Sequence, residues 1–196
     1  MKIGLITFAE PSSAKPKPDK LSPEVNRAIA SIFSEPSQFV SINLPLDQKQ
    51  LRAALIRLCD EEKCPLVLTL GHTGPGLNDF VPDVTLEIVD RKLPGFGEIM
   101  RFYSYERFKV SVLSRAEAGV RGKSLVINLP GKPKPIKFCL RLLQEGIAEA
   151  LEQIAGITPG LRGDEIVIPI DKYLPFLKKF RPQIDPNAPP SIKLGG

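Results

Sequence analysis

Short runs of apolar residues alternate along the chain with segments in which apolar residues recur every three or four positions. The runs are rich in leucine and β-branched residues and lack strict alternation with polar ones, which predicts strands that are covered on both faces. Five of these runs are therefore expected to form strands: Lys2–Phe8, Gln38–Ile42, Pro65–Leu70, Phe108–Leu113 and Ser124–Leu129.

The segments between these runs have the periodicity of amphipathic helices. Leu51, Leu55 and Leu58 fall on one stripe of such a segment, and Asp47 stands where its N-cap is expected. Helices are predicted at Pro23–Ser34, Asp47–Glu61 and Ile136–Ala155, and a further helix is predicted to open at Pro82. Strands that alternate with helices in this way predict an α/β fold with a mostly parallel sheet and helices on both faces.

Proline and polar residues divide the chain into a body and a C-terminal extension. Several of the 20 prolines lie in the polar segment 10–20, after the first predicted strand, and others lie in 181–196, which has little apolar content. We expect one α/β domain over residues 1–157 and an extension over 158–196 whose proline-rich end is flexible. Within the extension, Asp164–Ile170 has the composition of a strand, and Pro169 restricts that strand to the edge of a sheet.

Composition and charge exclude several classes of protein. No run approaches the ~20 apolar residues of a membrane-spanning helix, so we expect no membrane partner. Three cysteines without a CxxC pair predict free thiols in a reducing cytoplasm, and the single histidine, His72, excludes a multi-histidine metal site. The net charge of +5 would suit nucleic acid. However, aromatic residues make up only 7%, tryptophan is absent and no binding motif is recognised, so we expect no nucleic-acid partner.

A glycine-rich loop, TLGHTGPGLNDFVPD at residues 69–83, follows one predicted strand and precedes a predicted helix. Such a turn brings backbone N–H groups and a helix N-terminus to the edge of the sheet at which ligands of open α/β folds bind. The loop matches neither the P-loop pattern nor GxGxxG. Phosphate binding and a tight turn whose glycines serve only backbone geometry are therefore both open interpretations.

Two aspartates follow predicted strands of this sheet. Asp47 comes after the second strand and Asp79 after the third, so both fall on the carboxyl edge of one sheet. Carboxylate oxygens are the ligands that Mg²⁺ prefers, which makes the pair a candidate metal site. The alternative is that each aspartate is a capping or turn residue, a common role before a helix.

A second proline–glycine turn, NLPGKPK at residues 128–134, leads into the longest predicted helix. Between residues 118 and 144 there are six lysines and arginines and no aspartate or glutamate. Lys132 and Lys134 ahead of a helix suit a phosphate or pyrophosphate group, whereas a solvated loop is the alternative. The remaining segment of this kind, LPGFGE at residues 93–98, is expected to be a third loop.

Four segments now stand in a fixed order along the chain: TLGHTGPGLNDFVPD, LPGFGE, VLSR followed by AGVRG, and INLPGKPK. In this order and spacing they resemble the molybdopterin adenylyltransferase family of the MogA type, from the first predicted strand to about Ile157. The resemblance implies a three-layer α/β/α fold with a mostly parallel central sheet. It also implies a nucleotidyltransferase that transfers AMP from ATP to the phosphate of molybdopterin, with release of pyrophosphate, during molybdenum-cofactor biosynthesis.

The resemblance assigns roles to residues as well. The two functional aspartates of the family correspond to Asp47 and Asp79, which are thereby implied as catalytic residues and as ligands of Mg²⁺. The nucleotide and molybdopterin contacts of the family correspond to Gly71, Thr73, Gly74, Ser114, Arg115, Asn128, Pro130 and Gly131. The resemblance further implies a homotrimer with ATP and molybdopterin as substrates, and a partner for molybdenum insertion.

The chain departs from the family pattern in two places. His72 replaces the second glycine of T-x-G-G-T-G, and Ala9-Glu10 replaces Ser-Asp after the first strand. If φ is positive at residue 72, a histidine there is strained. We expect its side chain to point away from the site, since the family manages with glycine at this position. The departures motivate an alternative function, a catalytically weak or inactive paralogue that holds molybdopterin without turning it over.

Overall fold

The structure, a computed structural model, describes residues 1–9 and 21–162. Within these ranges the strands form one sheet in the order β2-β1-β3-β6-β5-β4. The strands are β1 (Lys2–Phe8), β2 (Gln38–Leu44), β3 (Leu66–Leu70), β4 (Arg91–Lys92), β5 (Ala118–Arg121) and β6 (Ser124–Leu129). β2, β1, β3 and β6 run parallel, whereas β5 and β4 are antiparallel additions beyond β6. The mostly parallel sheet that the sequence predicts is confirmed.

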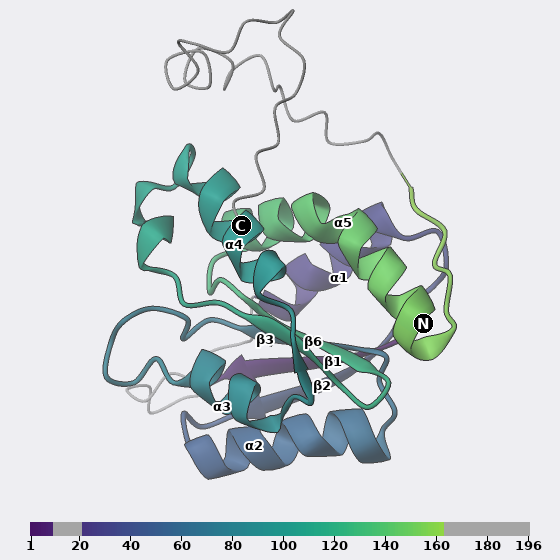
Figure 1. Cartoon of the computed structure of the whole chain (residues 1–196), viewed down its shortest axis with the longest axis horizontal. Helices are drawn as coiled ribbons and strands as arrows, with labels where there is room; N and C mark the ends of the chain where they lie inside the picture. The colour runs from purple at the N-terminus through teal and green to yellow at the C-terminus, as the bar shows by residue number, and fades with distance from the viewer. Residues whose placement is uncertain (10–20, 163–196) are drawn as a thin grey trace, which may run out of the picture. The chain divides into compact units, whose positions relative to one another are not determined.

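Helices cover both faces of this sheet (Figure 1). One face carries α1 (Leu21–Ile32), α4 (Pro94–Tyr105) and α5 (Pro133–Ala155), and the other carries α2 (Gln48–Ile56) and α3 (Val81–Ile88). A π-helical turn, η1 (Arg57–Glu61), continues α2, and a 3-10 helix, η2 (Lys109–Leu113), follows α4. The result is the expected three-layer α/β/α fold. In the described ranges no helix has the length and apolar character needed to cross a membrane.

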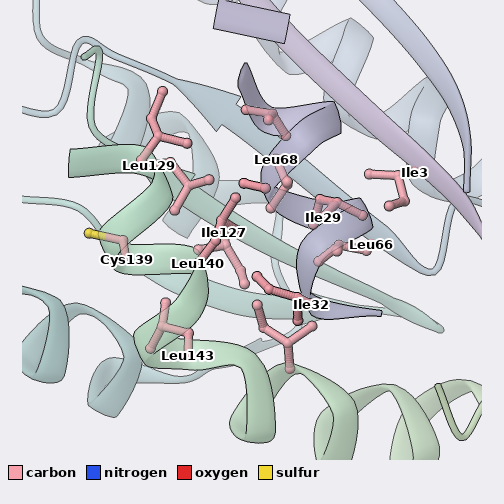
Figure 2. Packing of buried hydrophobic residues seen from close by; sticks show 14 of the residues in the cluster. Ile3, Ile29, Ile32, Leu66, Leu68, Ile127, Leu129, Cys139, Leu140 and Leu143 are labelled. Atoms are coloured by element: carbon pink, nitrogen blue, oxygen red, sulfur yellow. The ribbon is translucent and has the colours of Figure 1, made fainter. Parts of the chain in front are cut away.

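The larger hydrophobic core lies between the sheet and the face that carries α1 and α5. Figure 2 shows side chains from both helices and from β3 and β6 that point into one space: Ile29, Ile32, Leu66, Leu68, Ile127, Leu129, Leu140 and Leu143. β3 and β6 are buried along their whole length, which explains their continuous apolar sequence. Burial of this apolar surface fixes the two strands in register, with Leu70 beside Leu129 at their carboxyl ends.

One predicted strand is wrong. Lys109–Leu113 forms η2 instead, and the Ser111 N–H donates to the Phe108 carbonyl oxygen across 2.8 Å. Val110 and Val112 are 73% and 65% exposed, so their alternation does not mark a buried face. The place beside β6 is taken by β5, which the sequence analysis misses together with the two-residue β4.

The segment LPGFGE is not a loop, contrary to expectation. From Pro94 onward it forms the first turns of α4, where proline is tolerated because the first N–H groups of a helix have no intrahelical partner. A Cβ on Gly97 would stand 2.4 Å from the Ala116 carbonyl oxygen. Glycine at this position therefore lets α4 pack directly on the chain that leads into β5.

The predicted helices are confirmed, with shifts at their ends. Asp47 caps α2, since its Oδ1 accepts the Gln50 N–H across 2.8 Å. The helix expected at Pro82 opens at Val81, and the last helix begins at Pro133. The predictions for the loop 10–20, the edge strand 164–170 and the tail lie outside the described residues.

Candidate functional site

The site begins where two neighbouring parallel strands end. Gly71 follows β3 and Gly131 lies in the turn after β6, and the Gly71 N–H donates to the Leu129 carbonyl oxygen across 2.9 Å. A Cβ on Gly131 would lie 3.1 Å from the Gly71 Cα, and Gly71 itself has φ +92°. Glycine is thus required at Gly71 for its backbone conformation and at Gly131 for the close approach of the two turns.

The loop after β3 folds back around the carboxylate of Asp79. Asp79 Oδ2 accepts the Gly76 N–H across 3.0 Å, and a Cβ on Gly74 or Gly76 would come within 2.7 or 2.9 Å of that oxygen. The other oxygen, Oδ1, lies 3.5 Å from His72 Nδ1. Asp79 therefore ties the loop with one oxygen and presents the other toward the neighbouring side chain.

A cavity of about 330 Å³ opens beside this loop. Its volume falls at the lower end of the range of ligand sites, about 300–1,000 Å³. The predicted site residues that line it are Gly71, Thr73, Gly74, Asp79, Ser114, Pro130 and Gly131, and Lys132 joins them. The fold thus brings residues from three separate motifs around one space.

Asp47 is not among the residues that line this cavity. It caps α2 after β2, and β1 separates β2 from β3 in the sheet. The two aspartates share the carboxyl edge of the sheet, as the sequence predicts, but only Asp79 lies in the cavity.

The side-chain amide of the buried Asn128 makes three hydrogen bonds. Its Nδ2 donates to Thr69 Oγ1 across 3.0 Å and to Thr85 Oγ1 across 2.8 Å, while its Oδ1 accepts the Glu117 N–H across 3.3 Å. These bonds tie β6 to β3, to α3 and to the segment ahead of β5. Asn128 holds together the elements that carry the cavity, and its contact with a substrate stays a prediction.

Arg115 fastens the glycine loop to α3. Its N–H donates to the Thr73 carbonyl oxygen across 2.7 Å, and its Nε donates to that of Gly74 across 3.0 Å. The guanidinium also binds both carboxylate oxygens of Asp83, at 2.9 and 2.7 Å, and the carbonyl oxygen of Asp79. This hydrogen bonding by Arg115 holds the pKa of Asp83 below its usual value. Arg115 therefore acts on the loop from outside the cavity.

His72 lies differently from what the sequence analysis expects. Its φ is +52°, so the anticipated strain at a glycine position is present. Its side chain lines the cavity, near Asp79, and its ring meets the Phe8 ring edge-on at 5.0 Å. The expectation that it points away from the site is not met, since His72 is among the residues that line the cavity and its Nδ1 faces Asp79. Of the second departure from the family, only Ala9 is described; its N–H donates to the Leu44 carbonyl oxygen across 2.7 Å.

The wall of the cavity that faces the loop is not anticipated from the sequence. It includes Met100 and Ser104 of α4, Val110 of η2 and Cys139 of α5. The spacing of four between Met100 and Ser104 is a signal of one helix face, but the proline and glycines ahead of it favour a loop. Burial raises the pKa of the Cys139 thiol to about 11, so the thiol is protonated at neutral pH and is not a nucleophile.

The donor set at the polar end of the cavity fits a divalent cation in part. Asp79 supplies a carboxylate with lone pairs beyond the one that Gly76 uses. Across residues 1–9 and 21–162 there is no group of three or more His, Cys, Asp and Glu side chains that could enclose an ion. A cation here would therefore take its remaining ligands from phosphate and water, as Mg²⁺ commonly does at nucleotide sites.

Comparisons with known proteins identify chains of similar sequence and fold. Residues 40–151 match a family model described as a probable molybdopterin binding domain. The chain is 36% identical over 154 residues to a molybdopterin adenylyltransferase of Helicobacter pylori, a match that covers 79% of this chain and 88% of the relative. It is 35% identical over 191 residues to a molybdopterin adenylyltransferase of Haemophilus influenzae, which covers 93% of each chain. The crystal structure of the molybdopterin biosynthesis enzyme MoaB from Thermus thermophilus matches with a TM-score of 0.70 at 29% identity, over 80% of this chain and 97% of that one.

Proposed function

The chain belongs to this family of molybdopterin-binding domains, and from that premise we propose how its cavity transfers an adenylyl group. The chain is a molybdopterin adenylyltransferase, a nucleotidyltransferase of molybdenum-cofactor biosynthesis. The proposal concerns the donor of the AMP group, the metal ion and the residues that act in the reaction. ATP supplies AMP to the phosphate of molybdopterin, and pyrophosphate is released.

The observation that carries the proposal is the convergence of distant motifs on one cavity. The loop after β3, the turn after β6 and Ser114 all contribute to its lining, although they are far apart in sequence. A cavity at the carboxyl ends of two central parallel strands is where open α/β folds bind nucleotides. The apolar wall from α4, η2 and α5 suits the ring part of a ligand, and the glycine loop suits its phosphates.

The loop offers donors for phosphate oxygens. In the part of the chain that the structure describes, no protein acceptor pairs with the N–H groups of Thr73 and Gly74, whereas their carbonyl oxygens accept from Arg115. Lys132 lines the same cavity directly ahead of α5, whose N-terminus attracts negative charge. We assign the phosphates to the space between these groups.

The reaction needs little proton transfer. A phosphate oxygen of molybdopterin attacks the α-phosphorus of ATP, the bond from that phosphorus to the bridging oxygen breaks, and pyrophosphate leaves with the electron pair. The attacking monoester is already an anion, so no strong general base is required. Positioning by the loop and neutralisation of charge by Lys132 supply the rate, as in phosphoryl transfer generally.

We assign a divalent cation, Mg²⁺ in the ordinary case, to Asp79, with Asp47 as a second candidate ligand. Such an ion would neutralise charge on the leaving pyrophosphate. Asp79 lies in the cavity, and its Oδ2 is fixed by the Gly76 N–H. Asp47 uses Oδ1 as the cap of α2, so its role toward an ion would rest on Oδ2.

Arg115 is a positioning residue in this scheme. Its guanidinium is bound to Asp83 on both carboxylate oxygens and to the Gly74 carbonyl oxygen. It therefore shapes the loop to which we assign the phosphates, whereas Lys132 is the one of these two basic residues that lines the cavity.

The homotrimer, the molybdenum-insertion partner and the cytoplasmic location are proposals that rest on family membership. The apolar side chains of η2, Val110, Val112 and Leu113, are each more than half exposed, which suits a contact with another copy of the chain. The three cysteines are free thiols, which suits a reducing compartment.

Direct identification of the product tests the proposed reaction. Purified chain is incubated with molybdopterin, ATP and Mg²⁺, and the pterin product is analysed by mass spectrometry. We expect molybdopterin that has gained one adenylyl group. Binding of both substrates, measured by calorimetry, without formation of this product would instead support the paralogue that holds molybdopterin without turnover.

A further inference from the structure

One arginine of α4, Arg101, reaches from the wall of the cavity to the segment that leads into β5. Its Nη1 donates to the Ala116 carbonyl oxygen across 2.9 Å and, more weakly, to that of Ser114 across 3.5 Å. Its Nη2 donates to Glu117 Oε1 across 3.3 Å, and this ion pair is partly shielded, with side chains 27% and 21% exposed. A single planar guanidinium therefore holds three residues of the segment 114–117, which the compact ammonium of a lysine could not do.

These contacts fix the side chain of Ser114 as well as its backbone. Ser114 Oγ accepts the Ala116 N–H across 3.3 Å, and the carbonyl oxygens of the same two residues accept from Arg101. A hydroxyl oxygen that accepts a hydrogen bond keeps its own proton for donation. Because Ser114 lines the cavity, that proton can be donated to an oxygen atom of a ligand. The direction of the hydroxyl thus depends on Arg101, through Ala116.

Two further features support the place of this guanidinium in the fold. A Cβ on Gly97, one turn earlier in α4, would stand only 3.0 and 3.1 Å from Arg101 Nη1 and Nη2, so glycine leaves the space that the guanidinium fills. Ser111 Oγ of η2 donates to the Arg101 carbonyl oxygen across 3.3 Å. α4, η2 and the segment 114–117 are therefore joined at one residue.

We propose that Arg101 is a positioning residue for adenylyl transfer and acts through Ser114 rather than on a substrate. The inference rests on the proposed function, because it concerns the same cavity and the same reaction. Arg101 holds the Ser114 hydroxyl where it donates to a phosphate oxygen of the nucleotide as the α-phosphorus is attacked. An interaction that is made fully only in the transition state raises kcat and leaves KM nearly unchanged. A small displacement of such a group costs up to about 100-fold in rate.

Kinetics of an Arg101 variant test this role. Arg101→Gln removes the guanidinium, and Arg52→Gln, which breaks an ion pair with Glu87 on the other face of the sheet, is the matched control. Pyrophosphate release is measured over a range of ATP and molybdopterin concentrations, at a temperature at which circular dichroism shows each protein to be folded. We expect kcat to fall about tenfold or more in Arg101→Gln, with KM for each substrate within about threefold of wild type, and no change in the control. If Arg101→Gln does not fold, Arg101→Lys is used, which keeps the charge but lacks the planar fork of donors.

A double-mutant cycle identifies the residue through which Arg101 acts. In a Ser114→Ala background, Arg101→Gln should cost less than about twofold in kcat, because the hydroxyl that it positions is already absent. An unchanged kcat in folded Arg101→Gln, a rise in KM alone, or the full loss in the Ser114→Ala background would overturn the proposal.

Hydrogen exchange provides a readout that needs no turnover. The backbone N–H groups of residues 114–117 should exchange about tenfold or more faster in Arg101→Gln than in the wild type and in Arg52→Gln. Equal exchange in the three proteins would also overturn the proposal. If the wild type releases no pyrophosphate, the proposed function fails, whereas unchanged kinetics or exchange in Arg101→Gln beside an active wild type overturns this inference alone.

Discussion

Asp47 caps α2 through one carboxylate oxygen, so substitution can separate its structural role from a catalytic one. Asparagine is as good a cap as aspartate but carries no charge. We expect Asp47→Asn to melt like the wild type and to lose most AMP transfer, whereas Asp47→Ala should also lose about 1 kcal/mol of stability. Urea unfolding and the transfer assay check the two effects. Wild-type turnover in Asp47→Asn would limit this residue to its capping role.

Asn128 is the buried residue on whose bonds the cavity depends. Replacement by alanine leaves the Thr69 and Thr85 hydroxyls and the Glu117 N–H without their partner. We expect Asn128→Ala to lower the free energy of unfolding by about 1–3 kcal/mol, the usual penalty for unpaired buried groups. Urea denaturation measures it, and Asn78→Ala at an exposed position serves as the control, with no comparable loss. A loss no larger than that of the control would show that the network does not stabilise the fold.

At the scale of elements, α4 contains two glycines that should respond in opposite ways to alanine. A Cβ on Gly97 would meet the Ala116 carbonyl oxygen at 2.4 Å, whereas one on Gly95 meets nothing within 4 Å. We expect Gly97→Ala to destabilise by about 1–3 kcal/mol through overpacking. Gly95→Ala should be neutral or stabilising by up to about 1 kcal/mol, because alanine restricts the unfolded chain. Thermal unfolding of both variants tests the packing of α4, and equal effects would contradict it.

The ion pair between Arg115 and Asp83 joins the glycine loop to α3, and its contribution to stability should depend on pH. Hydrogen bonding by Arg115 lowers the pKa of Asp83 in the folded state, so the stabilisation is present at neutral pH and is lost as the pH falls through that lowered pKa. The Asp83 side chain is 51% exposed, so the pair contributes at most about 1 kcal/mol. Urea unfolding of wild type and Asp83→Asn should show a difference at pH 7 that shrinks below about pH 3.9. A difference unchanged at lower pH would assign the effect to something other than this pair.

The strands that the sequence predicts well are those that are buried on both faces. β3 and β6 are buried on both faces, so their apolar runs identify them with almost no error in their bounds. η2 has similar composition, but its valines face solvent, and local composition does not distinguish these two cases. α4 is missed because Pro94 and two glycines open it. Gly97 has to be a glycine because it packs against the Ala116 carbonyl oxygen, which belongs to a later segment of the chain. β4 and β5 are too short to give a periodic signal.

At the scale of the whole molecule, one side of the cavity is predicted from the sequence and the opposite wall is not. The glycine loop and the NLPGK turn are predicted to share an edge because each follows a parallel strand, and they do meet at Gly71 and Gly131. The wall from α4 and η2 depends on how a helix packs across the sheet, which no local pattern encodes. The contacts of the His72 side chain are with Phe8, at the end of another strand, and with Asp79, and no local pattern predicts the first of them. Tertiary contacts thus decide what the sequence leaves open.

Release of pyrophosphate shows whether this cavity transfers an adenylyl group to molybdopterin. Wild-type protein and Asp79→Asn are each incubated with ATP and Mg²⁺, with and without molybdopterin, and pyrophosphate is measured over time. Asparagine keeps an oxygen for the Gly76 N–H, so Asp79→Asn should remain folded. We expect release by the wild type only when molybdopterin is present, and a rate about 100-fold or more lower in Asp79→Asn. Equal release by the two proteins, or no release by a folded wild type that binds both substrates, would contradict this expectation.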